Sequence, residues 1–229
     1  MEIKQFVWDI VDSNSWLILE GKHGLLIDAV KSAGLEAEIK ELVSITIILT
    51  HAHFDHIVGL NSLRELKSNA TVIATSMCSD HIGNKFKNMS STAEAFMAFY
   101  HEGENRNYKI DPFTCKPVDK TFEDGYRFEW FGHRIELNEV HGHSNDGLIA
   151  VVDDRYMFSG DTLLPIPTIT RFPGGSGKRF WSEDIPMLNA MEGIEKIYPG
   201  HGMPGRMQDM LDVNVMPSLI KRLSDNLTF

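Results

Sequence analysis

Three histidines and one aspartate lie within six positions of the chain, in the segment "LTHAHFDHIVGL" at residues 49–60. They are His51, His53, Asp55 and His56. Imidazole nitrogens and carboxylate oxygens bind zinc, iron, manganese or nickel. In an extended segment His51 and His53 point to one side, and a turn is then needed to bring Asp55 and His56 to a neighbouring point. Four such donors would also fill one closed tetrahedral site, so this segment alone indicates metal binding and not catalysis.

Three further candidate ligands follow downstream, each at the predicted end of a strand and each beside glycine. They are His143 in "EVHGHSNDG", Asp161 in "MFSGDTLL" and His201 in "IYPGHGMPG". Glycine lets the backbone pass close to a site, and open α/β sheets gather their ligand sites at strand ends. Seven donors are too many for one tetrahedral metal and fit two.

The seven donors divide naturally between two metals. We assign them as His51, His53 and His143 to a first metal, Asp55, His56 and His201 to a second, and Asp161 as a bridging carboxylate. Two metals about 3.5–4 Å apart can share a hydroxide whose pKa is lowered towards neutrality, which gives a nucleophile at pH 7.

The elements that must position these residues alternate between strands and helices along the chain. β-Branched and aromatic runs, turn residues and helical spacing of apolar residues predict the order of elements. Strands are expected at 5–11, 15–21, 23–29, 45–49, 70–75, 127–131, 133–140, 147–153, 155–160 and 195–199. Helices are expected at 31–42, 59–68, 183–192 and 209–223, the last of them broken at Pro217.

The segment from 77 to about 121 differs from its surroundings. Two helices are expected at 77–86 and 91–102, followed by an irregular loop at 105–117. Insertions of this length are usually functional, so we expect a single α/β domain over residues 1–229 with a lid-like insertion at about 77–121. Four aromatic residues in its middle either contact substrate or pack the insertion's own small core; they are Phe96, Phe99, Tyr100 and Tyr108.

Composition narrows the classes of partner. The net charge of −10 and the pI near 5.4 disfavour a nucleic-acid binder, whose phosphate contacts need a basic face. The two cysteines are far apart and outside any CxxC, as in a reduced protein. The start of the chain lacks a signal-peptide pattern, and no apolar run reaches the roughly 20 residues that span a bilayer. We therefore expect a soluble, cytoplasmic protein with no membrane partner; its oligomeric state is left open.

The four motifs "THAHFDH", "HGHS", "SGDTLL" and "YPGHG" occur in the order and context of the metallo-β-lactamase superfamily, over about residues 12–205. This resemblance implies a four-layer αββα sandwich, the metallo-β-lactamase fold, with a binuclear site at one edge of two sheets. It implies the same ligand roles for the seven residues above. "SGDTLL" and "YPGHG" look most like the glyoxalase II (hydroxyacylglutathione hydrolase) branch. β-Lactamases of this fold usually carry cysteine where Asp161 stands, which argues against antibiotic hydrolysis as the main activity.

The leading hypothesis is a metal-dependent hydrolase that attacks an acyl carbon in a small-molecule thioester, lactone or ester. A hydroxide bridging the metals would be the nucleophile, one metal would polarise the carbonyl oxygen, and the other would stabilise the leaving group. Asp55 and Asp161 are the expected catalytic residues, with Asp55 orienting the hydroxide as well as binding metal. Two divalent ions are expected per chain, zinc first, with iron or manganese as alternatives.

Three alternatives remain at this point. Persulfide dioxygenases share the fold and use one iron held by two histidines and an aspartate, a set that His51, His143 and Asp161 could supply. A phosphodiesterase or nuclease fits the ligand set but not the charge of −10. A metal-binding protein without activity is the last alternative, and the intact ligand set argues against it.

Two features depart from the pattern of the resembled family: the length of the 77–121 segment and a histidine in the third motif. His141 stands where proline is usual, and it is either a group behind the ligands or a packed histidine. No motif identifies the residues that would hold glutathione. Basic residues that could meet an anionic substrate, or could simply be solvated, are Arg171, Lys178 and Arg179 after Asp161, and Lys221 and Arg222 in the last helix.

Overall fold

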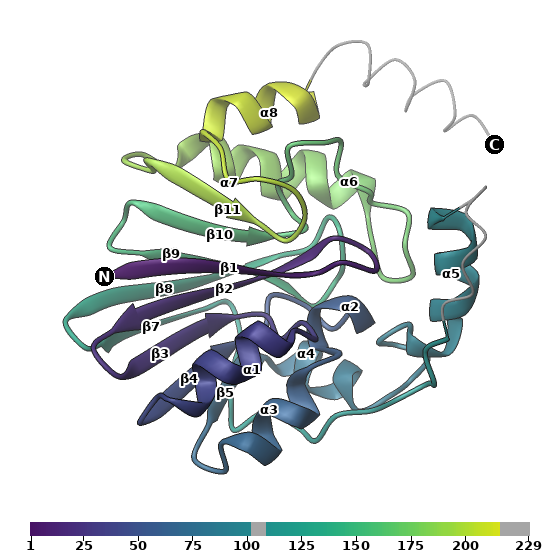
Figure 1. Ribbon diagram of the computed structural model, residues 1–229. Helices are drawn as coiled ribbons and strands as arrows, with labels where there is room; N and C mark the ends of the chain where they lie inside the picture. The colour runs from purple at the N-terminus through teal and green to yellow at the C-terminus, as the bar shows by residue number, and fades with distance from the viewer. Residues whose placement is uncertain (102–108, 216–229) are drawn as a thin grey trace.

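Two mixed β-sheets form the centre of the protein (Figure 1). The structure is a computed structural model and describes residues 1–101 and 109–215. The first sheet has the strand order β1-β2-β3-β4-β5-β6, and the second has the order β11-β10-β9-β8-β7. The strands are β1 (Glu2–Trp8), β2 (Ser13–Glu20), β3 (His23–Ile27), β4 (Ser44–Ile48), β5 (Thr71–Thr75), β6 (Lys120–Phe122), β7 (Gly125–Trp130), β8 (His133–Val140), β9 (Gly147–Val152), β10 (Tyr156–Gly160) and β11 (Lys196–Pro199).

The first sheet changes from antiparallel to parallel pairing along its width. β1, β2 and β3 form an antiparallel meander, whereas β3, β4, β5 and β6 pair in parallel. Parallel strands must be joined by crossovers, which the intervening helices supply. The carboxyl ends of β3, β4 and β5 therefore meet at one edge of the sheet, and the segment that leaves β4 begins there.

The second sheet brings three chain segments to the same end of the sandwich. β7 to β10 pair antiparallel in sequence order, and β11 pairs with β10 in parallel. The turn between β8 and β9 and the carboxyl ends of β10 and β11 consequently lie close together. β11 ends at Pro199, which cannot donate a ladder hydrogen bond.

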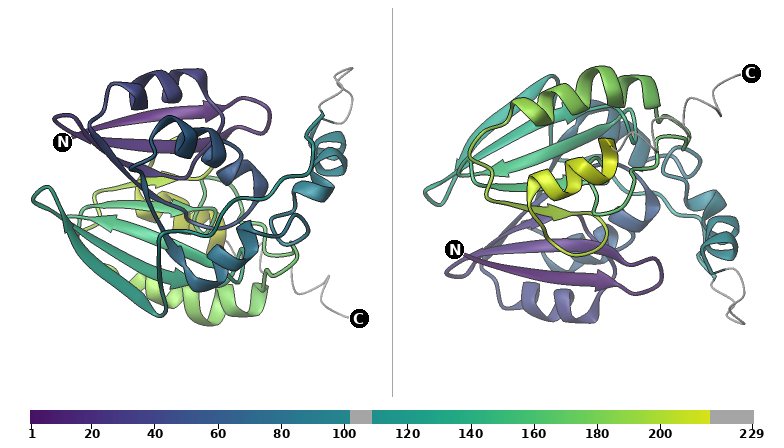
Figure 2. Two further views of the ribbon diagram at one scale, coloured as in Figure 1. Left: turned by 90° about the horizontal axis from the view of Figure 1, so that it is seen from below. Right: turned by 90° about the horizontal axis from the view of Figure 1, so that it is seen from above.

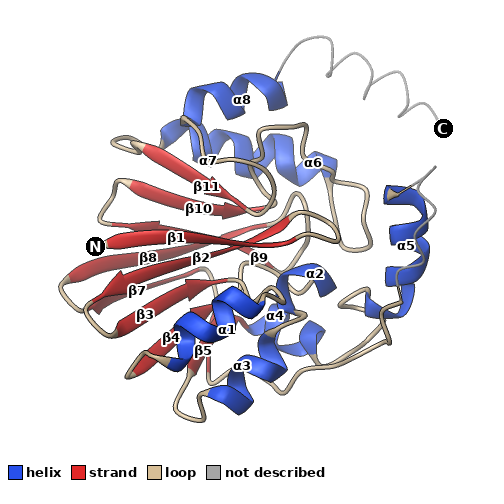
Figure 3. Ribbon diagram, in the orientation of Figure 1, coloured by secondary structure: helices blue, strands red, loops and turns tan. Residues whose placement is uncertain are grey.

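Helices cover the outer face of each sheet, which gives four layers (Figures 2 and 3). α1 (Ala33–Lys40), α3 (Leu60–Leu66) and α4 (Ser76–Ile82) pack on the first sheet through one apolar cluster. The second sheet is covered through another cluster by the π-helical turn η2 (Phe180–Asp184), α7 (Ile185–Ala190) and α8 (Met207–Val215). The short helix α6 (Gly177–Arg179) leads into η2. The predicted αββα sandwich is confirmed. Within the described ranges, the helices are all too short or too polar to cross a membrane.

The inner faces of the two sheets share a third apolar cluster. Ile18, Leu25 and Ile48 of the first sheet and Leu137 and Phe158 of the second are completely buried there. Burial on this scale, at about 25 cal/mol per Å² of apolar surface, is the main stabilising term for such a sandwich. This buried cluster makes the two sheets a rigid support for the candidate ligands at their edges.

Backbone contacts lock the two sheets together at the edge where the candidate ligands lie. The Asn14 amide donates to the Gly200 carbonyl at 2.7 Å, and the Trp16 indole donates to the Pro199 carbonyl at 2.9 Å. On the other side of the sandwich, the Leu148 amide donates to the Thr50 carbonyl, also at 2.7 Å. The ends of β4 and β11 are thus each fixed to the opposite sheet.

The 77–121 segment divides into two structural parts. Cys78, Ile82 and Cys115 are buried in the cluster over the first sheet, so α4 and the return of the chain belong to the outer layer. The stretch between them holds η1 (Ser90–Thr92) and α5 (Ala93–Tyr100), which stands at the edge of the sandwich in all views (Figures 1 and 2). The lid role of this second part stays a prediction, and residues 102–108 lie outside the described ranges.

Most predicted elements are present, with shifted ends. The predicted helix at 77–86 ends at Ile82, and helical structure over the second sheet begins at Gly177, earlier than the expected 183. The three-residue strand β6 and the one-turn helix α2 (Phe54–Ile57) were not predicted because such short elements carry no periodicity. The expected break at Pro217, together with Lys221 and Arg222, lies outside the described residues.

At the opposite end of the sandwich, His133 starts β8 between two carboxylates. Its Nδ1 lies 2.7 Å from Asp153 and its Nε2 lies 3.4 Å from Glu20. The hydrogen bond that His133 donates to Asp153 raises the pKa of His133; partial burial opposes this rise, and Glu20 adds to it. Protonated His133 therefore stabilises the folded protein fully when the pH is below the ordinary pKa of histidine. This contribution is lost as the pH rises through the raised pKa of His133.

We expect the thermal stability of the wild type to exceed that of His133→Gln most clearly at about pH 5.5 and hardly at all at about pH 9. Thermal unfolding of both proteins across this range measures the difference. A difference in melting temperature that does not change with pH would mean that His133 acts through packing and not through its charge.

Candidate metal centre

The segment that leaves β4 turns sharply and delivers four donors in quick succession. β4 is buried and flanked by strands on both sides, so Leu49 and Thr50 after it are held in place. His51 and His53 follow in extended backbone, and His53 is the N-terminal flanking residue of α2. The single turn of α2 then carries Asp55 and His56 back towards the same point. The turn that the sequence requires is therefore this short helix.

The other three candidate ligands come from the second sheet. His143 lies in the β8–β9 turn, Asp161 follows β10, and His201 follows β11. Glycine is needed beside them: a Cβ on Gly200 would lie 2.1 Å from Asp161 Oδ1 and 2.8 Å from the His56 ring. Any side chain at position 200 would thus displace the carboxylate.

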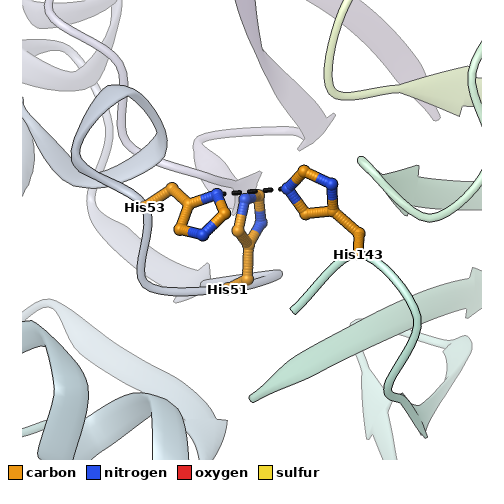
Figure 4. A group of neighbouring side chains, drawn as sticks. All are labelled: His51, His53 and His143. Atoms are coloured by element: carbon orange, nitrogen blue, oxygen red, sulfur yellow. Dashed lines mark hydrogen bonds between the residues drawn. The ribbon is translucent and has the colours of Figure 1, made fainter. Parts of the chain in front are cut away.

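The structure brings all seven predicted donors together. Within the described ranges, three triads have donor atoms within 4.8 Å of one another: His51, His53 and His143; Asp55, His56 and His201; and His51, His56 and Asp161. Figure 4 shows the imidazoles of the first triad turned towards one another, with His53 Nδ1 3.1 Å from His143 Nε2. The first two triads are the two predicted sets.

Asp161 lies between the two predicted triads. Its Oδ2 is 3.5 Å from His143 Nε2 of the first triad and also 3.5 Å from His201 Nε2 of the second. Its Oδ1 is 3.4 Å from His56 Nε2. Within the second triad, Asp55 Oδ2 lies 3.2 Å from His201 Nε2. This placement agrees with the bridging position expected for Asp161.

The donor atoms themselves indicate that the cluster fits a metal. His51 Nε2, His56 Nε2 and Asp161 Oδ1 are buried and have no hydrogen-bond partner. Buried polar atoms without a partner are costly and therefore rare in folded proteins. Mixed imidazole and carboxylate donors aimed at a common space suit zinc, iron or manganese, and a bound divalent cation would satisfy these atoms.

A second layer of contacts fixes the orientation of three imidazoles. His56 Nδ1 lies 2.9 Å from Asp28 Oδ2, and His143 Nδ1 lies 2.7 Å from the Ile169 carbonyl. The Thr50 hydroxyl donates to Asp28 at 2.8 Å, so it accepts from His51 Nδ1 at 3.0 Å. With the proton on Nδ1 in each ring, Nε2 presents its lone pair to the cluster.

Asp28 is the functional residue that the sequence reasoning missed. Its backbone is left-handed, with φ at 60°, and its carboxylate also accepts from the Thr50 amide at 2.7 Å. An aspartate directly after the buried strand "GLLI" carries the same strand-end signal as Asp161. It was overlooked because neither histidine nor glycine flanks it.

The charges of the first triad and of Asp161 suit metal binding at neutral pH, whereas the neighbouring carboxylates raise the pKa of His56 and His201 against the effect of burial. Burial holds the pKa of His51 well below its ordinary value, lowers the pKa of His53 to about 4, and lowers that of His143, so these rings are neutral donors. Burial alone would raise the pKa of Asp161, but His201 and His56 outweigh it and hold that pKa well below its ordinary value. Neutral imidazoles and an ionised carboxylate are the forms that bind metal.

The cluster opens onto a cavity of about 470 Å³. His53, Asp55, His143, Asp161 and His201 form its floor. The walls are mainly apolar and come from loops at the sandwich edge and from the 77–121 segment; they include Val11, Phe54, Met89, Phe96, Leu164, Pro165, Ile166, Ile169 and Phe172. Of the four aromatic residues singled out in the insertion, Phe96 reaches the cavity. Tyr108 and the side chains of Phe99 and Tyr100 lie outside the description.

The model of the metallo-β-lactamase superfamily matches residues 8–201 of the chain. The chain belongs to this superfamily. Proteins of this fold bind divalent metals, and the buried histidine–aspartate cluster is compatible with such binding. The family resemblance predicted from the four motifs is thus confirmed.

The relatives with known names within the superfamily include glyoxalase II enzymes, as the motifs indicated. A hydroxyacylglutathione hydrolase of Photobacterium profundum is 25% identical over 193 residues, which are 83% of this chain and 62% of that protein. A glyoxylase B2 of Dictyostelium discoideum is 26% identical over 161 residues, which are 69% of this chain and 49% of that protein. The chain therefore spans only about half to three fifths of the length of these relatives.

Solved structures of superfamily members share the fold. The BLEG-1 B3 metallo-β-lactamase superposes with a TM-score of 0.73 at 20% identity, covering 93% of this chain and 98% of that one. At these identities the superposition establishes the architecture alone.

The basic residues predicted near the mouth do not line the cavity. The described lining residues include neither Arg171 nor Lys178 nor Arg179. Arg179 is held on the surface by Glu183, with Nε 2.8 Å from one carboxylate oxygen. Phe172, next to Arg171, occupies the wall instead.

His141 stands beside the superfamily ligands without joining them. Its Nδ1 lies 3.3 Å from the Asn145 carbonyl, and its Nε2 lies 3.8 Å from Glu139. Its backbone amide donates to Asp184 at 3.1 Å, and Asp184 also accepts from the Gly142 amide at 2.7 Å. His141 thus supports the turn that presents His143 and is one residue of a smaller polar cavity of about 220 Å³.

Proposed function

We propose that the protein is a metal-dependent hydrolase that attacks the acyl carbon of a thioester, lactone or ester. The observation that carries this proposal is the pair of intact donor triads that share Asp161 at the floor of a cavity. We propose two divalent ions per chain, zinc first, with iron or manganese as alternatives. Such ions supply a hydroxide nucleophile at neutral pH and polarise the carbonyl oxygen of the substrate.

The protein itself supplies position and charge for this reaction. No described residue that lines the cavity carries a hydroxyl or a thiol, which supports water as the proposed nucleophile. Burial would raise the pKa of Asp55, but His56 and His201 lower it, so its carboxylate is ionised and accepts a hydrogen bond from the attacking water. Asp55 and Asp161 are the proposed catalytic residues: Asp55 orients the water, and Asp161 holds the two triads together.

Metal removal tests the proposal. Dialysis against a chelator should abolish hydrolysis of thioesters and lactones and should lower the melting temperature, because a ligand at 100 times its Kd stabilises the native state by about 2.7 kcal/mol. Zinc, iron or manganese should restore both properties. Calcium is the matched control, since it prefers sites made only of oxygen ligands. Full activity of the metal-free protein would refute a metal-dependent mechanism.

Two further activity measurements on the purified protein test the alternative reactions. Faster turnover of phosphodiesters than of acyl substrates would replace our proposal by a phosphodiesterase, which the net charge of −10 disfavours. Consumption of oxygen with glutathione persulfide would replace it by an iron oxidoreductase. We also propose a cytoplasmic location, which the two buried free thiols Cys78 and Cys115 support.

A further inference from the structure

We propose that the acyl substrate of this site is apolar and uncharged, and that the cavity selects it by burying its chain against an aromatic wall. This inference rests on the proposed hydrolase function, which it deepens by naming the substrate class.

Aromatic rings pack in a row beside the metal ligands and contribute to one wall of the cavity. The Phe172 ring meets the rings of His53 and His143 edge to face, with centroids 5.4 and 5.6 Å away. Phe96 follows at 5.8 Å from Phe172, and Phe54 at 6.1 Å from Phe96. Such an arrangement offers a continuous apolar surface that begins beside the reacting carbonyl.

Aliphatic side chains form the facing wall and continue outside the cavity. Leu164 is buried, whereas Ile166 is 55% and Ile169 is 49% exposed. Met203, next to the lining residue Gly202, is 69% exposed. Several large apolar side chains around one opening mark a binding site for apolar groups.

The aliphatic wall is held in place by α8. Asn214 accepts from the Thr168 amide at 2.8 Å and donates to the Leu164 carbonyl at 3.1 Å. The loop between these residues therefore keeps its shape without substrate, and an acyl chain would not have to order it on binding.

Away from the metal ions, the side chains of the cavity walls offer no partner to an anionic group on the acyl chain. Within the described parts of the chain, no lining residue is lysine or arginine, and the carboxylates at the floor are the proposed ligands Asp55 and Asp161. A substrate carboxylate buried here would lose its hydration without gaining an ion pair from these walls. A neutral acyl chain has no charged group whose hydration would be lost. It gains about 0.8 kcal/mol of binding free energy for each buried CH₂, which corresponds to about a threefold to fourfold change in an equilibrium constant.

The first test compares matched neutral and anionic substrates on the metal-loaded protein. Between p-nitrophenyl acetate and octanoate, kcat/KM should rise about threefold for each CH₂ until the cavity is filled. Esters of equal length that end in a carboxylate should be hydrolysed at least about tenfold more slowly. Equal rates along the neutral series, or a preference for the carboxylate-ended esters, would overturn the inference.

A pair of surface variants locates the effect. Ile166→Lys places a cation in the rim and should reduce kcat/KM for the octanoate about tenfold, with less effect on the acetate. Val43→Lys is the matched control, because Val43 is 59% exposed but lies between α1 and β4, far from the cavity. An identical response of both variants would contradict the proposed wall.

Binding without turnover separates this inference from the proposed function. The neutral fluorescent probe N-phenyl-1-naphthylamine should bind the metal-free protein, decanamide should displace it, and Ile166→Lys should weaken its binding about tenfold. If the probe binds in this way but no acyl substrate is hydrolysed, the hydrolase proposal fails and the apolar site stands. If substrates are hydrolysed but the probe does not bind, the apolar site is refuted.

Discussion

Asp161→Asn should reduce kcat/KM for acyl substrates by at least about a thousandfold while the protein remains folded. The substitution keeps the shape of the side chain but removes the charge that lies between the two triads, 3.5 Å from a nitrogen of each. A metal pair contributes several kcal/mol to stabilisation of the transition state, and a thousandfold loss corresponds to about 4 kcal/mol. Elemental analysis should show fewer than two metal equivalents per chain.

The matched control for this substitution is Asp212→Asn, an identical change on the exposed side of α8. It should leave metal content and kcat/KM unchanged. If Asp161→Asn retained both the metal content and the rate of the wild type, Asp161 would not bridge the triads, and the assignment of catalytic residues would fail with it.

Asp28→Asn should weaken metal binding about 10-fold to 100-fold, although Asp28 itself is too far back to bind the metal. Asparagine tolerates the left-handed backbone at this position, where φ is 60°. However, an amide in place of the carboxylate cannot accept from the Thr50 amide, the Thr50 hydroxyl and His56 Nδ1 together. One buried donor is left unsatisfied, which costs about 1–3 kcal/mol of folding free energy.

Competition with a fluorescent chelator measures the affinity, and thermal unfolding of the metal-free protein measures the stability. Asp154→Asn makes the same change at an exposed position that is also left-handed, with φ at 56°, and should alter neither quantity. Unchanged affinity in Asp28→Asn would mean that the orientation of His56 and His51 does not depend on this carboxylate.

The ligands were predictable because the signal for each is local. A buried strand, a donor and a flanking glycine are adjacent in sequence at His143, Asp161 and His201, so the strand ends could be read without knowing the sheet order. The αββα layers, in contrast, were predicted only from the family resemblance, because the strand pattern alone indicated no more than an α/β domain. Asp28 shows the limit of this approach, because its partners Thr50 and His56 lie beyond the next helix and strand.

The cavity walls were less predictable than the ligands. Their residues come from loops before β2, after β10 and within the 77–121 segment, and loop conformation leaves no periodic pattern. For this reason the charge of the loop after Asp161 suggested a basic mouth, whereas the structure turns Phe172 and Ile169 towards the cavity and leaves Arg171 exposed. Part of the predicted insertion proved to be core for a similar reason: Cys78 and Cys115 meet only through tertiary contacts.

The order of the donors along the chain has a consequence for how the protein matures. His51, His53, Asp55 and His56 emerge from the ribosome together, whereas the other three donors follow only after the rest of the first sheet and two strands of the second. Four donors in one segment are enough to capture a metal ion before the second sheet exists. We therefore expect metal supply during synthesis, and not only afterwards, to determine how much of the protein reaches its native state in the cell.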